Sequence, residues 1–275
     1  MSSVNRILID SRFRQPDSRS TTDFRVELPE TIYMDSGMTC VVWDTCIPIT
    51  WLTVEEHVND KVYSRLYQSD AFTYKDYIMT IASRNYVKGE LVEELNNQFE
   101  ALNVVLRANE DPYRNLGRIF LPSDSNLSFM IFNNMDLRSR CNNTWQGEYY
   151  SVINPQSLND MIGNSEHNMK RYTAVSMFEG GQFNVMPHHT IYITCAQLGN
   201  FRTLGPQGER DIIKKVIVTG NANEIMYDNY LNAEDFIDVS RQTLRSLNFK
   251  LVDVYGNVVN LHGQNFSFSL VFKPL

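Results

Sequence analysis

The feature of the sequence that most constrains its fold is an alternation of large apolar and small side chains near residue 270. The large residues are Phe266, Phe268, Leu270 and Phe272, and the small ones between them are Ser267, Ser269 and Val271. Because successive side chains of a strand point to opposite faces, this segment is expected to be a strand with one aromatic face and one mostly polar face. The aromatic face needs a second sheet to cover it. We therefore expect two packed antiparallel sheets.

The segment before this strand alternates in the same way. Leu247, Phe249 and Leu251 are separated by polar residues, and Tyr255-Gly256-Asn257 predicts a tight reversal of the chain. Two such segments on either side of a turn region are typical of neighbouring strands in a β-sandwich. We expect much of the core to come from six of their residues: Phe249, Leu251, Phe266, Phe268, Leu270 and Phe272.

The rest of the chain is also typical of β structure, with 15 Phe, 14 Tyr and 3 Trp among 275 residues. We expect further strands at 24–29, 38–47, 190–195 and 212–218, with a proline closing each of the first two, Pro29 and Pro48. An even number of positions separates Cys40 from Cys46, so both are expected on one face of their strand. This pattern favours a mainly β fold, a single jelly-roll β-sandwich, although periodicity alone leaves an immunoglobulin-like sandwich open.

One region departs from the β pattern and predicts an inserted α+β module at about 72–132. Its apolar residues Leu91, Leu95, Phe99 and Leu102 recur at helical spacing, which predicts one helix over 89–102. Short strands are expected around it at 77–81, 104–106, 118–121 and 128–132. The expected domain organisation is thus a jelly roll over 23–275, interrupted by this module.

Residues 1–22 are expected to form an extended N-terminal arm. This segment is rich in Ser and Thr and contains the arginines Arg6, Arg12, Arg14 and Arg19. The apolar run Ile7, Leu8 and Ile9 needs a surface to pack on, so we expect the arm to leave the roll and dock on a neighbouring subunit. A loose terminus is the alternative. The arm residues named as subunit-interface candidates are Ile7, Leu8, Ile9, Arg12 and Arg14.

A second interface candidate is the turn-rich segment at 204–210. Gly205, Pro206 and Gly208 restrict its backbone to special conformations, which lowers the cost of ordering it on association. Arg202, Glu209 and Arg210 supply charges that can set the register between subunits. The alternative is an ordinary surface turn that links two strands.

Charge and composition exclude several classes of protein. The net charge of -7 argues against specific binding of nucleic acid, because neutralising phosphates requires an excess of Lys and Arg. No apolar run approaches the roughly 18–20 residues of a membrane span, and the first residues do not match a signal peptide. Four cysteines in 275 residues do not make a disulfide scaffold. We expect a soluble protein with reduced thiols, made in a reducing compartment.

The sequence contains no catalytic, cofactor or metal signature. The five histidines His57, His167, His188, His189 and His262 form no i, i+2 or i, i+4 pair. No G-x-S-x-G elbow, P-loop or G-x-G-x-x-G is present. We therefore expect no enzyme, no catalytic residue, no cofactor and no metal ligand. A Cys–His dyad that meets only in space stays as an alternative.

Several strand and turn segments resemble a family of viral proteins. They are 5–14 (NRILIDSRFR), 20–29 (STTDFRVELP), 46–51 (CIPITW), 198–206 (LGNFRTLGP) and 249–257 (FKLVDVYGN). Together they resemble the penton-type minor capsid proteins of virophages, Polintons and Polinton-like viruses. The likeness reaches both ends of the chain and is weakest between about 108 and 176.

The resemblance implies a single jelly roll that stands upright at the five-fold vertices of an icosahedral capsid. Five copies would form a homopentamer surrounded by double-jelly-roll major capsid proteins, in a virion assembled inside the host cell. The family's insertions point outward, which makes the module at 72–132 the candidate for contact with a host receptor. No specific nucleic acid and no membrane span are implied.

Two other classes of function stay open on the sequence alone. One is a receptor- or carbohydrate-binding jelly-roll module of a virion, with Trp51, Trp145, Tyr149 and Tyr150 as the aromatic residues that would hold sugars. The other is a small β-rich enzyme that uses Cys or His. Assembly into five-fold rings distinguishes the capsid protein from the first, and loss of activity on changing one Cys or His would identify the second.

Overall fold

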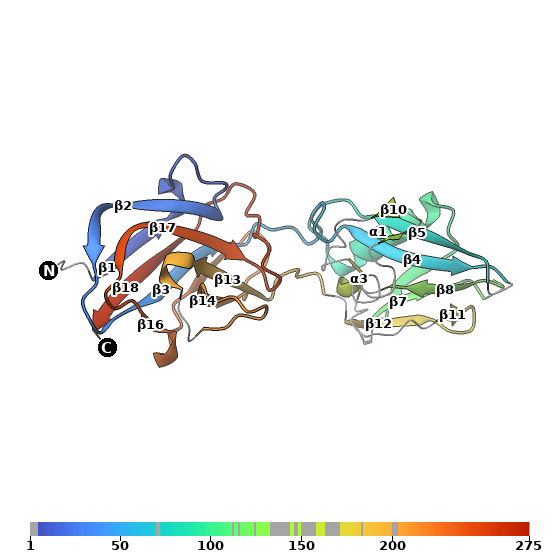
Figure 1. The fold of residues 1–275 in the computed structure, drawn as a ribbon. Coiled ribbons are helices and arrows are strands. Elements are labelled where there is room, and N and C mark those ends of the chain that lie inside the picture. Colours follow the sequence, from blue (N-terminus) through green and yellow to red (C-terminus); the bar gives the residue numbers. More distant parts are fainter. Residues whose placement is uncertain are drawn as a thin grey trace. The chain divides into compact units, whose positions relative to one another are not determined.

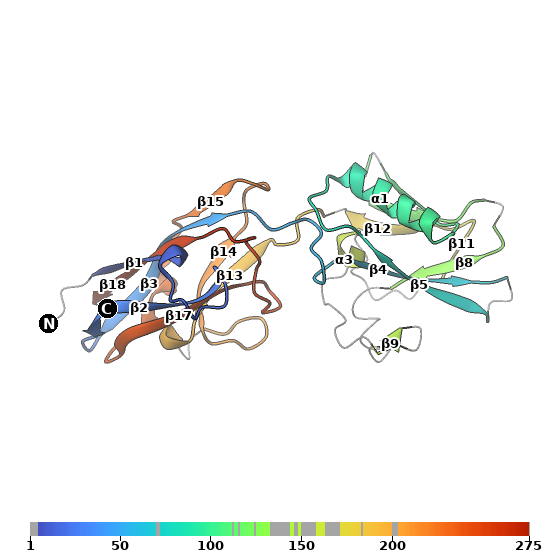
Figure 2. The ribbon, with the colours of Figure 1, turned by 90° about the horizontal axis from the view of Figure 1, so that it is seen from above.

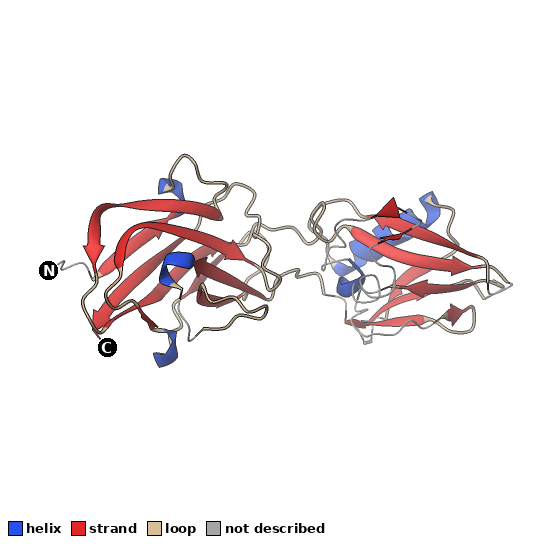
Figure 3. Ribbon diagram, in the orientation of Figure 1, coloured by secondary structure: helices blue, strands red, loops and turns tan. Residues whose placement is uncertain are grey.

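The chain forms two compact units that we describe separately. In this computed structural model the described residues are 5–69, 72–111, 113–114, 116–123, 125–132, 144–145, 148–149, 158–162, 171–182, 184–199 and 203–274. One unit, called the roll unit, comprises Met1–Trp51 and His188–Leu275. The other, called the insertion unit, comprises Leu52–Pro187 (Figure 1). Strands dominate both units (Figure 3).

Two antiparallel sheets build the roll unit. The first sheet has the order β1 (Arg6–Asp10), β18 (Ser267–Pro274), β3 (Met38–Pro48) and β15 (Ile225–Asp228), and the short β16 (Ile237–Asp238) also pairs with β3. The second sheet has the order β14 (Ile212–Ile217), β13 (Thr190–Cys195), β17 (Thr243–Val252) and β2 (Asp23–Tyr33). Figure 2 shows β15 and β1 on one side of the unit and β2 and β17 on the other.

The path of the chain through these sheets is that of a jelly roll. It visits the first sheet with β1 and β3 and the second with β2 between them, then adds the neighbours β13 and β14 to the second sheet. It returns through β15 to the first sheet, and β17 and β18 place its last two long strands in different sheets. The predicted mainly β, single jelly-roll fold is confirmed, and the insertion unit lies between β3 and β13 in the sequence.

The core between the two sheets consists of the predicted residues. All six side chains are 2% exposed or less: Phe249, Leu251, Phe266, Phe268, Leu270 and Phe272. The ring of Phe268 lies 5.0 Å from that of Phe249 in the opposite sheet, and Phe24 lies 5.6 Å from Phe266. Aromatic rings from both sheets therefore interlock, as the alternation in the sequence predicts.

The expected arm differs from the structure, because its first part is a strand of the roll. β1 pairs antiparallel with β18, and Ile9 lies opposite Phe268 with only 1% of its surface exposed. Without β1, β18 would present a long unpaired edge. The apolar run that was expected to need a neighbouring subunit thus finds its partner within its own chain.

A β-bulge in β3 explains a second difference. Ser269 of β18 lies opposite Asp44, whereas the next residue, Leu270, lies opposite Val42, so Trp43 is an extra residue. An extra residue reverses the alternation of faces beyond it. Cys40 therefore points into the core, while Cys46 is only half-buried, and the expectation that both lie on one face was wrong.

The strand β2 continues past Pro29, which was expected to end it. The pairing of β2 with β17 is irregular at this point: Glu27 lies opposite Ser246, and the next paired residue is Ile32, opposite Leu244. Pro29 sits in the interruption, where no ladder bond is required from its nitrogen. The guanidinium of Arg245 donates a hydrogen bond to the carbonyl oxygen of Pro29 at 3.0 Å, which bridges the irregular stretch.

The insertion unit is larger than the module predicted at 72–132. One of its sheets has the order β11 (Tyr172–Thr173), β8 (Ser128–Ile131), β4 (Lys61–Tyr67) and β5 (Tyr74–Thr80). Another has the order β12 (Phe178–Gln182), β7 (Leu116–Phe120) and β6 (Arg107–Glu110), and a two-stranded sheet joins β9 (Thr144–Trp145) with β10 (Glu148–Tyr149). The boundaries were wrong because β4, β11 and β12 share these sheets with strands inside the predicted range.

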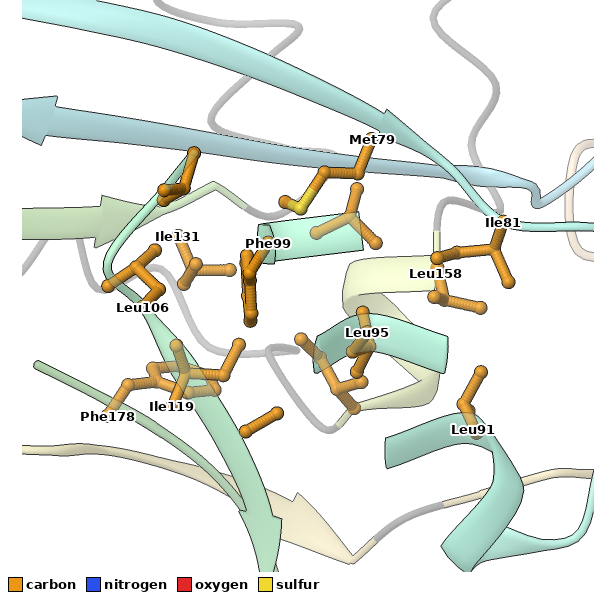
Figure 4. Packing of buried hydrophobic residues seen from close by; sticks show 14 of the residues in the cluster. Met79, Ile81, Leu91, Leu95, Phe99, Leu106, Ile119, Ile131, Leu158 and Phe178 are labelled. Atoms are coloured by element: carbon orange, nitrogen blue, oxygen red, sulfur yellow. The ribbon is translucent and has the colours of Figure 1, made fainter. Parts of the chain in front are cut away.

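The predicted helix is present and lies in the core of the insertion unit. α1 (Lys88–Ala101) buries Leu91, Leu95 and Phe99 completely. Figure 4 shows these side chains packed with residues of β5, β7, β8 and β12 and with the short helix α3 (Leu158–Met161). The expected strand at 104–106 is absent, and β6 begins at Arg107 instead. The insertion unit therefore has a hydrophobic core of its own.

Candidate subunit interface

The segment at 204–210 is a tight turn held by its own hydrogen bonds. It lies between the 3-10 helix η2 (Ala196–Leu198) and β14. The amide of Gly205 donates to the carbonyl of Glu209 at 2.7 Å, and the amide of Gly208 donates to the carbonyl of Gly205 at 3.0 Å. Leu204 and Pro206 are exposed. The turn thus presents a preformed surface.

Three residues of this turn serve its structure. A Cβ on Gly205 would collide with the carboxylate of Glu209 and the Cδ1 of Ile212. Gly208 has a φ of +96°, which favours glycine. The carboxylate of Glu209 accepts a hydrogen bond from the amide of Gln207 at 2.9 Å, so reversing the charge of Glu209 would disturb the turn itself. The exposed side chains of the turn are the better probes of an interface.

The predicted arginines of the N-terminal segment make contacts within their own chain. Arg12 forms an ion pair with Asp10, with a shortest N–O distance of 2.5 Å, and its hydrogen bonds lower the pKa of the Asp10 carboxyl. Arg14 donates to the carbonyl oxygen of Ser11 at 2.9 Å. Both arginines therefore stabilise the turn after β1. Two further arginines were predicted as interface residues at or next to the turn at 204–210. Arg210 is exposed, and Arg202 lies outside the described residues.

The outer face of the first sheet exposes a row of large apolar side chains. Leu8 of β1, Trp43 of β3, and Ile225 and Tyr227 of β15 are 74%, 44%, 69% and 63% exposed. The strand pairings place Leu8, Ile225 and Tyr227 on one face, because Leu8 lies opposite Ser269, Ser269 opposite Asp44, Tyr227 opposite Cys46, and Ile225 opposite Pro48. Trp43 is the extra residue of the bulge, next to Asp44, and its side chain is exposed. We call these four residues the apolar row. Of these four residues only Leu8 was predicted as an interface residue, because exposed and buried apolar residues look alike in a sequence.

Charged and polar groups lie between Leu8 and the rest of the apolar row. The guanidinium of Arg6 donates to the carboxylate of Asp44 at 2.6 Å and to the hydroxyl of Ser269 at 3.0 Å. That hydroxyl donates to the other carboxylate oxygen of Asp44 at 2.8 Å. Three adjacent strands are thus joined by side-chain hydrogen bonds on their solvent face, which holds this face in one shape.

The outer face of the second sheet has a different character. Lys215 and Ile217 of β14 are exposed there, and so is Lys250 of β17. Tyr192 of β13 lies opposite Lys215 of β14, so its side chain is on the same face. The two outer faces of the roll unit therefore differ. The first presents mostly aromatic and aliphatic surface, and the second is charged, with Lys215, Lys250, the acid Asp23 opposite Lys250, and Glu27 of β2.

Two thiols of the roll unit, those of Cys40 and Cys195, are buried. Burial raises the pKa of the Cys195 thiol to about 12 and that of the Cys40 thiol still further, so both are protonated and poorly nucleophilic near neutral pH. Among the described residues, no three His, Cys, Asp or Glu side chains are grouped to hold a metal ion. Within the same part of the chain, no helix is long and apolar enough to cross a membrane. Cys141 and His167 lie outside it.

Of the four aromatic residues expected to hold sugars, Trp51 is the one whose surroundings the structure describes. Trp51 is 3% exposed and packs edge-on against the imidazole of His188, with ring centroids 5.4 Å apart. Burial lowers the pKa of His188, so this contact involves a neutral ring near neutral pH. Trp145 and Tyr149 lie in β9 and β10, and Tyr150 is outside the described residues. Trp51 is thus a core residue of the roll unit.

The architecture described above is that of a single jelly roll interrupted by one large insertion between β3 and β13. A solved structure with a similar fold is that of the mavirus penton protein, to which this chain is 9% identical with a TM-score of 0.52. The similarity covers 98% of this chain and 99% of the mavirus chain, so it includes both units. No family model matches the sequence, and no curated protein matches it either.

Proposed function

We propose that this chain is a penton-type minor capsid protein of an icosahedral virus, related to those of virophages and Polinton-like viruses. It acts as a structural protein of the virion and forms pentamers at the five-fold vertices, next to the major capsid proteins. The observation that carries the proposal is the end-to-end similarity to the mavirus penton protein, which includes both the roll unit and the insertion unit. A shared jelly roll alone would support far less, because this fold serves many functions.

A ring of five copies requires each subunit to present two different surfaces to its two neighbours. The outer faces of the two sheets meet this requirement, because they belong to opposite sides of the sandwich and differ in chemistry. We propose that the apolar row of one copy contacts the lysine-bearing face of the next copy. Lys215 or Lys250 can then lie over the rings of Trp43 and Tyr227, an arrangement that favours cation–π contacts.

The proposed ring can be tested with the full-length recombinant chain. Light scattering during size-exclusion chromatography should give a particle of five times the 31.9 kDa of one chain, and negative-stain images should show five-fold rings. The variant Tyr227→Lys places a positive charge in the apolar row, opposite the lysines of the neighbour. It should weaken the equilibrium constant of each subunit contact by at least about tenfold, the effect of roughly 1.4 kcal/mol, and so lower the pentamer fraction at a fixed concentration.

The matched control is Tyr113→Lys, which makes the same change at a tyrosine of the insertion unit that is 96% exposed. This variant should assemble as the wild type does, and both variants should keep the wild-type melting temperature. A chain that stays monomeric at all concentrations and is absent from purified particles would overturn the proposed capsid role. Pentamers that tolerate Tyr227→Lys would remove the apolar row from the interface but leave the capsid role standing.

A further inference from the structure

One pair of aromatic side chains joins the two points at which the roll unit continues into the insertion unit. Trp51 is the last residue of the roll unit before the insertion, and His188 is the first residue of the roll unit after it. Their rings pack edge-on with centroids 5.4 Å apart, and Trp51 is 3% and His188 8% exposed. A buried contact within the roll unit therefore holds the two connections to each other.

Backbone hydrogen bonds next to this contact tie each connection to a neighbouring part of the roll unit. The amide of Ile49 donates to the carbonyl oxygen of Glu224 at 2.8 Å, and the carbonyl oxygen of Ile49 accepts from the amide of Asn223 at 2.7 Å. On the other connection, the carbonyl oxygen of His189 accepts from the amide of Val218 at 3.0 Å. Because these bonds lie one or two residues from the ring contact, their opening reports whether that contact is intact.

Two titratable groups act on the imidazole of His188, namely Asp253 in the turn after β17 and its own neighbour His189. Burial has the largest effect and lowers the pKa of His188, the charge of Asp253 raises it, and His189 lowers it further. The Asp253 carboxylate is 3% exposed and accepts hydrogen bonds from the amides of Tyr255 and Asn257 at 2.8 and 2.9 Å, which hold it in its own turn. The attraction of Asp253 for a protonated ring is therefore smaller than the cost of burying that ring.

We propose that His188 is an acid-sensitive contact that holds the two connections at neutral pH and releases them on mild acidification, when protonation of its imidazole breaks the packing on Trp51. A charged imidazole in this nearly closed site lacks most of its hydration, whereas opening the contact returns the charge to water. The proposal does not depend on the capsid role, since it rests on contacts within the roll unit.

The pH range of the release follows from the open and closed states of the contact. In the open state His188 is exposed to water and titrates near its ordinary pKa of 6.5, whereas in the closed state its pKa is lower. The closed contact therefore has its full stability above about pH 6.5 and loses it as the pH falls toward the lowered pKa. Within this range, one pH unit changes the ratio of open to closed contacts by up to about tenfold.

The test is hydrogen exchange of the full-length chain at about pH 7.4 and about pH 5, on either side of the range in which a histidine titrates. Protection factors of the Ile49, Asn223 and Val218 amides, corrected for the intrinsic exchange rate at each pH, should fall at least about fivefold in acid. The comparison amide is that of Phe272, which donates to the carbonyl oxygen of Asn5 at 2.9 Å and should keep its protection. An NMR titration should place the pKa of His188 below 6.5.

Two variants separate His188 from other groups that titrate in this range. His188→Phe keeps an aromatic ring but binds no proton, so protection of the three amides should no longer depend on pH. The matched control is His57→Asn, which removes an exposed histidine of the insertion unit whose φ of +62° asparagine also adopts. This control should keep the pH dependence of the wild type.

The wild-type measurements decide the proposal even if His188→Phe does not fold. It would be overturned by a His188 pKa at or above 6.5, by protection of the three amides that is equal at both pH values, or by an equal loss at Phe272, which would mean that the whole roll unit opens. Unchanged pH dependence in a folded His188→Phe variant would overturn it as well.

Discussion

Phe268 lies where the two sheets of the roll unit meet. Its ring contacts that of Phe249 from the opposite sheet at 5.0 Å and stacks on that of Phe266 at 5.8 Å. Phe268→Ala would remove a ring that is 2% exposed and leave a cavity between rigid sheets. We expect the free energy of unfolding to fall by about 3–5 kcal/mol, measured by chemical denaturation.

The comparison residue for this measurement is Phe13, which is 77% exposed in the 3-10 helix after β1. Phe13→Ala makes the same chemical change without a cavity, so the free energy of unfolding should change by less than about 0.5 kcal/mol. Equal losses for both variants would mean that the aromatic core is not what stabilises the roll.

Single residues also show where prediction from the sequence stopped. The inward alternation of Phe249 and Phe268 could be predicted, because it depends only on the period of a strand. The opposite orientations of Cys40 and Cys46 could not, since they depend on the bulge at Trp43. The structural role of Glu209 could not be predicted either, because its hydrogen bond from the amide of Gln207 depends on the shape of the turn.

At the scale of elements, β1 is the part of the roll whose removal has the clearest consequence. Ile9 is 1% exposed opposite Phe268, while its neighbour Leu8 is 74% exposed on the other face. We expect Ile9→Ala to lower the free energy of unfolding by about 2–5 kcal/mol. Leu8→Ala should change it by no more than about 0.5 kcal/mol, because this side chain leaves no cavity.

The variants Ile9→Ala and Leu8→Ala together test whether residues 6–10 form a strand of the roll or an arm that docks on a neighbouring subunit. If residues 6–10 left the roll, both variants would unfold as the wild type does and would differ only in assembly. Thermal and chemical denaturation measures the stability of the two variants, and their elution profiles measure assembly. These measurements therefore distinguish the strand from the arm. Leu8→Ala belongs to the apolar row, so it is the variant in which assembly is expected to weaken while stability is kept.

The sequence predicted β18, β13 and α1 nearly residue for residue, since each is long enough to show its period. It misjudged β1, whose Ile7-Leu8-Ile9 run is apolar on both faces and has no alternation to identify its partner. The partner is β18, more than 250 positions away. Pairing over such a distance is decided by the whole sheet and leaves no local signal.

At the scale of the whole molecule, the insertion unit is joined to the roll unit at neighbouring points. Trp51 and His188, the residues of the roll on either side of the insertion, lie in contact with ring centroids 5.4 Å apart. Replacing Leu52–Pro187 by a short Gly/Ser linker should therefore leave the roll unit folded, since the linker has little distance to span. Circular dichroism and amide dispersion in NMR spectra would check this.

A sample of the shortened chain that aggregates or shows no dispersion would contradict the independence of the two units. The insertion unit has its own buried cluster, which includes Leu95, Phe99 and Phe129, and this is why we expect the roll to keep its stability without it. The sequence predicted an insertion but placed it at 72–132, because α1 was its only strong signal. The flanking strands β4 and β12 became recognisable only through their pairing.

The two connections have a mechanical consequence. The chain enters the insertion unit at Leu52, four residues after β3 ends at Pro48, and leaves it at Pro187, shortly before β13 begins at Thr190. Each of these strands lies inside its sheet, β3 between β18 and β15, and β13 between β14 and β17. A pull on the insertion unit is thus transmitted to the ends of two central strands, one in each sheet. The hydrogen bonds between neighbouring strands run across the strand direction. A force along β3 or β13 therefore shears the hydrogen bonds to both neighbouring strands at the same time, and both sheets of the roll unit oppose the force.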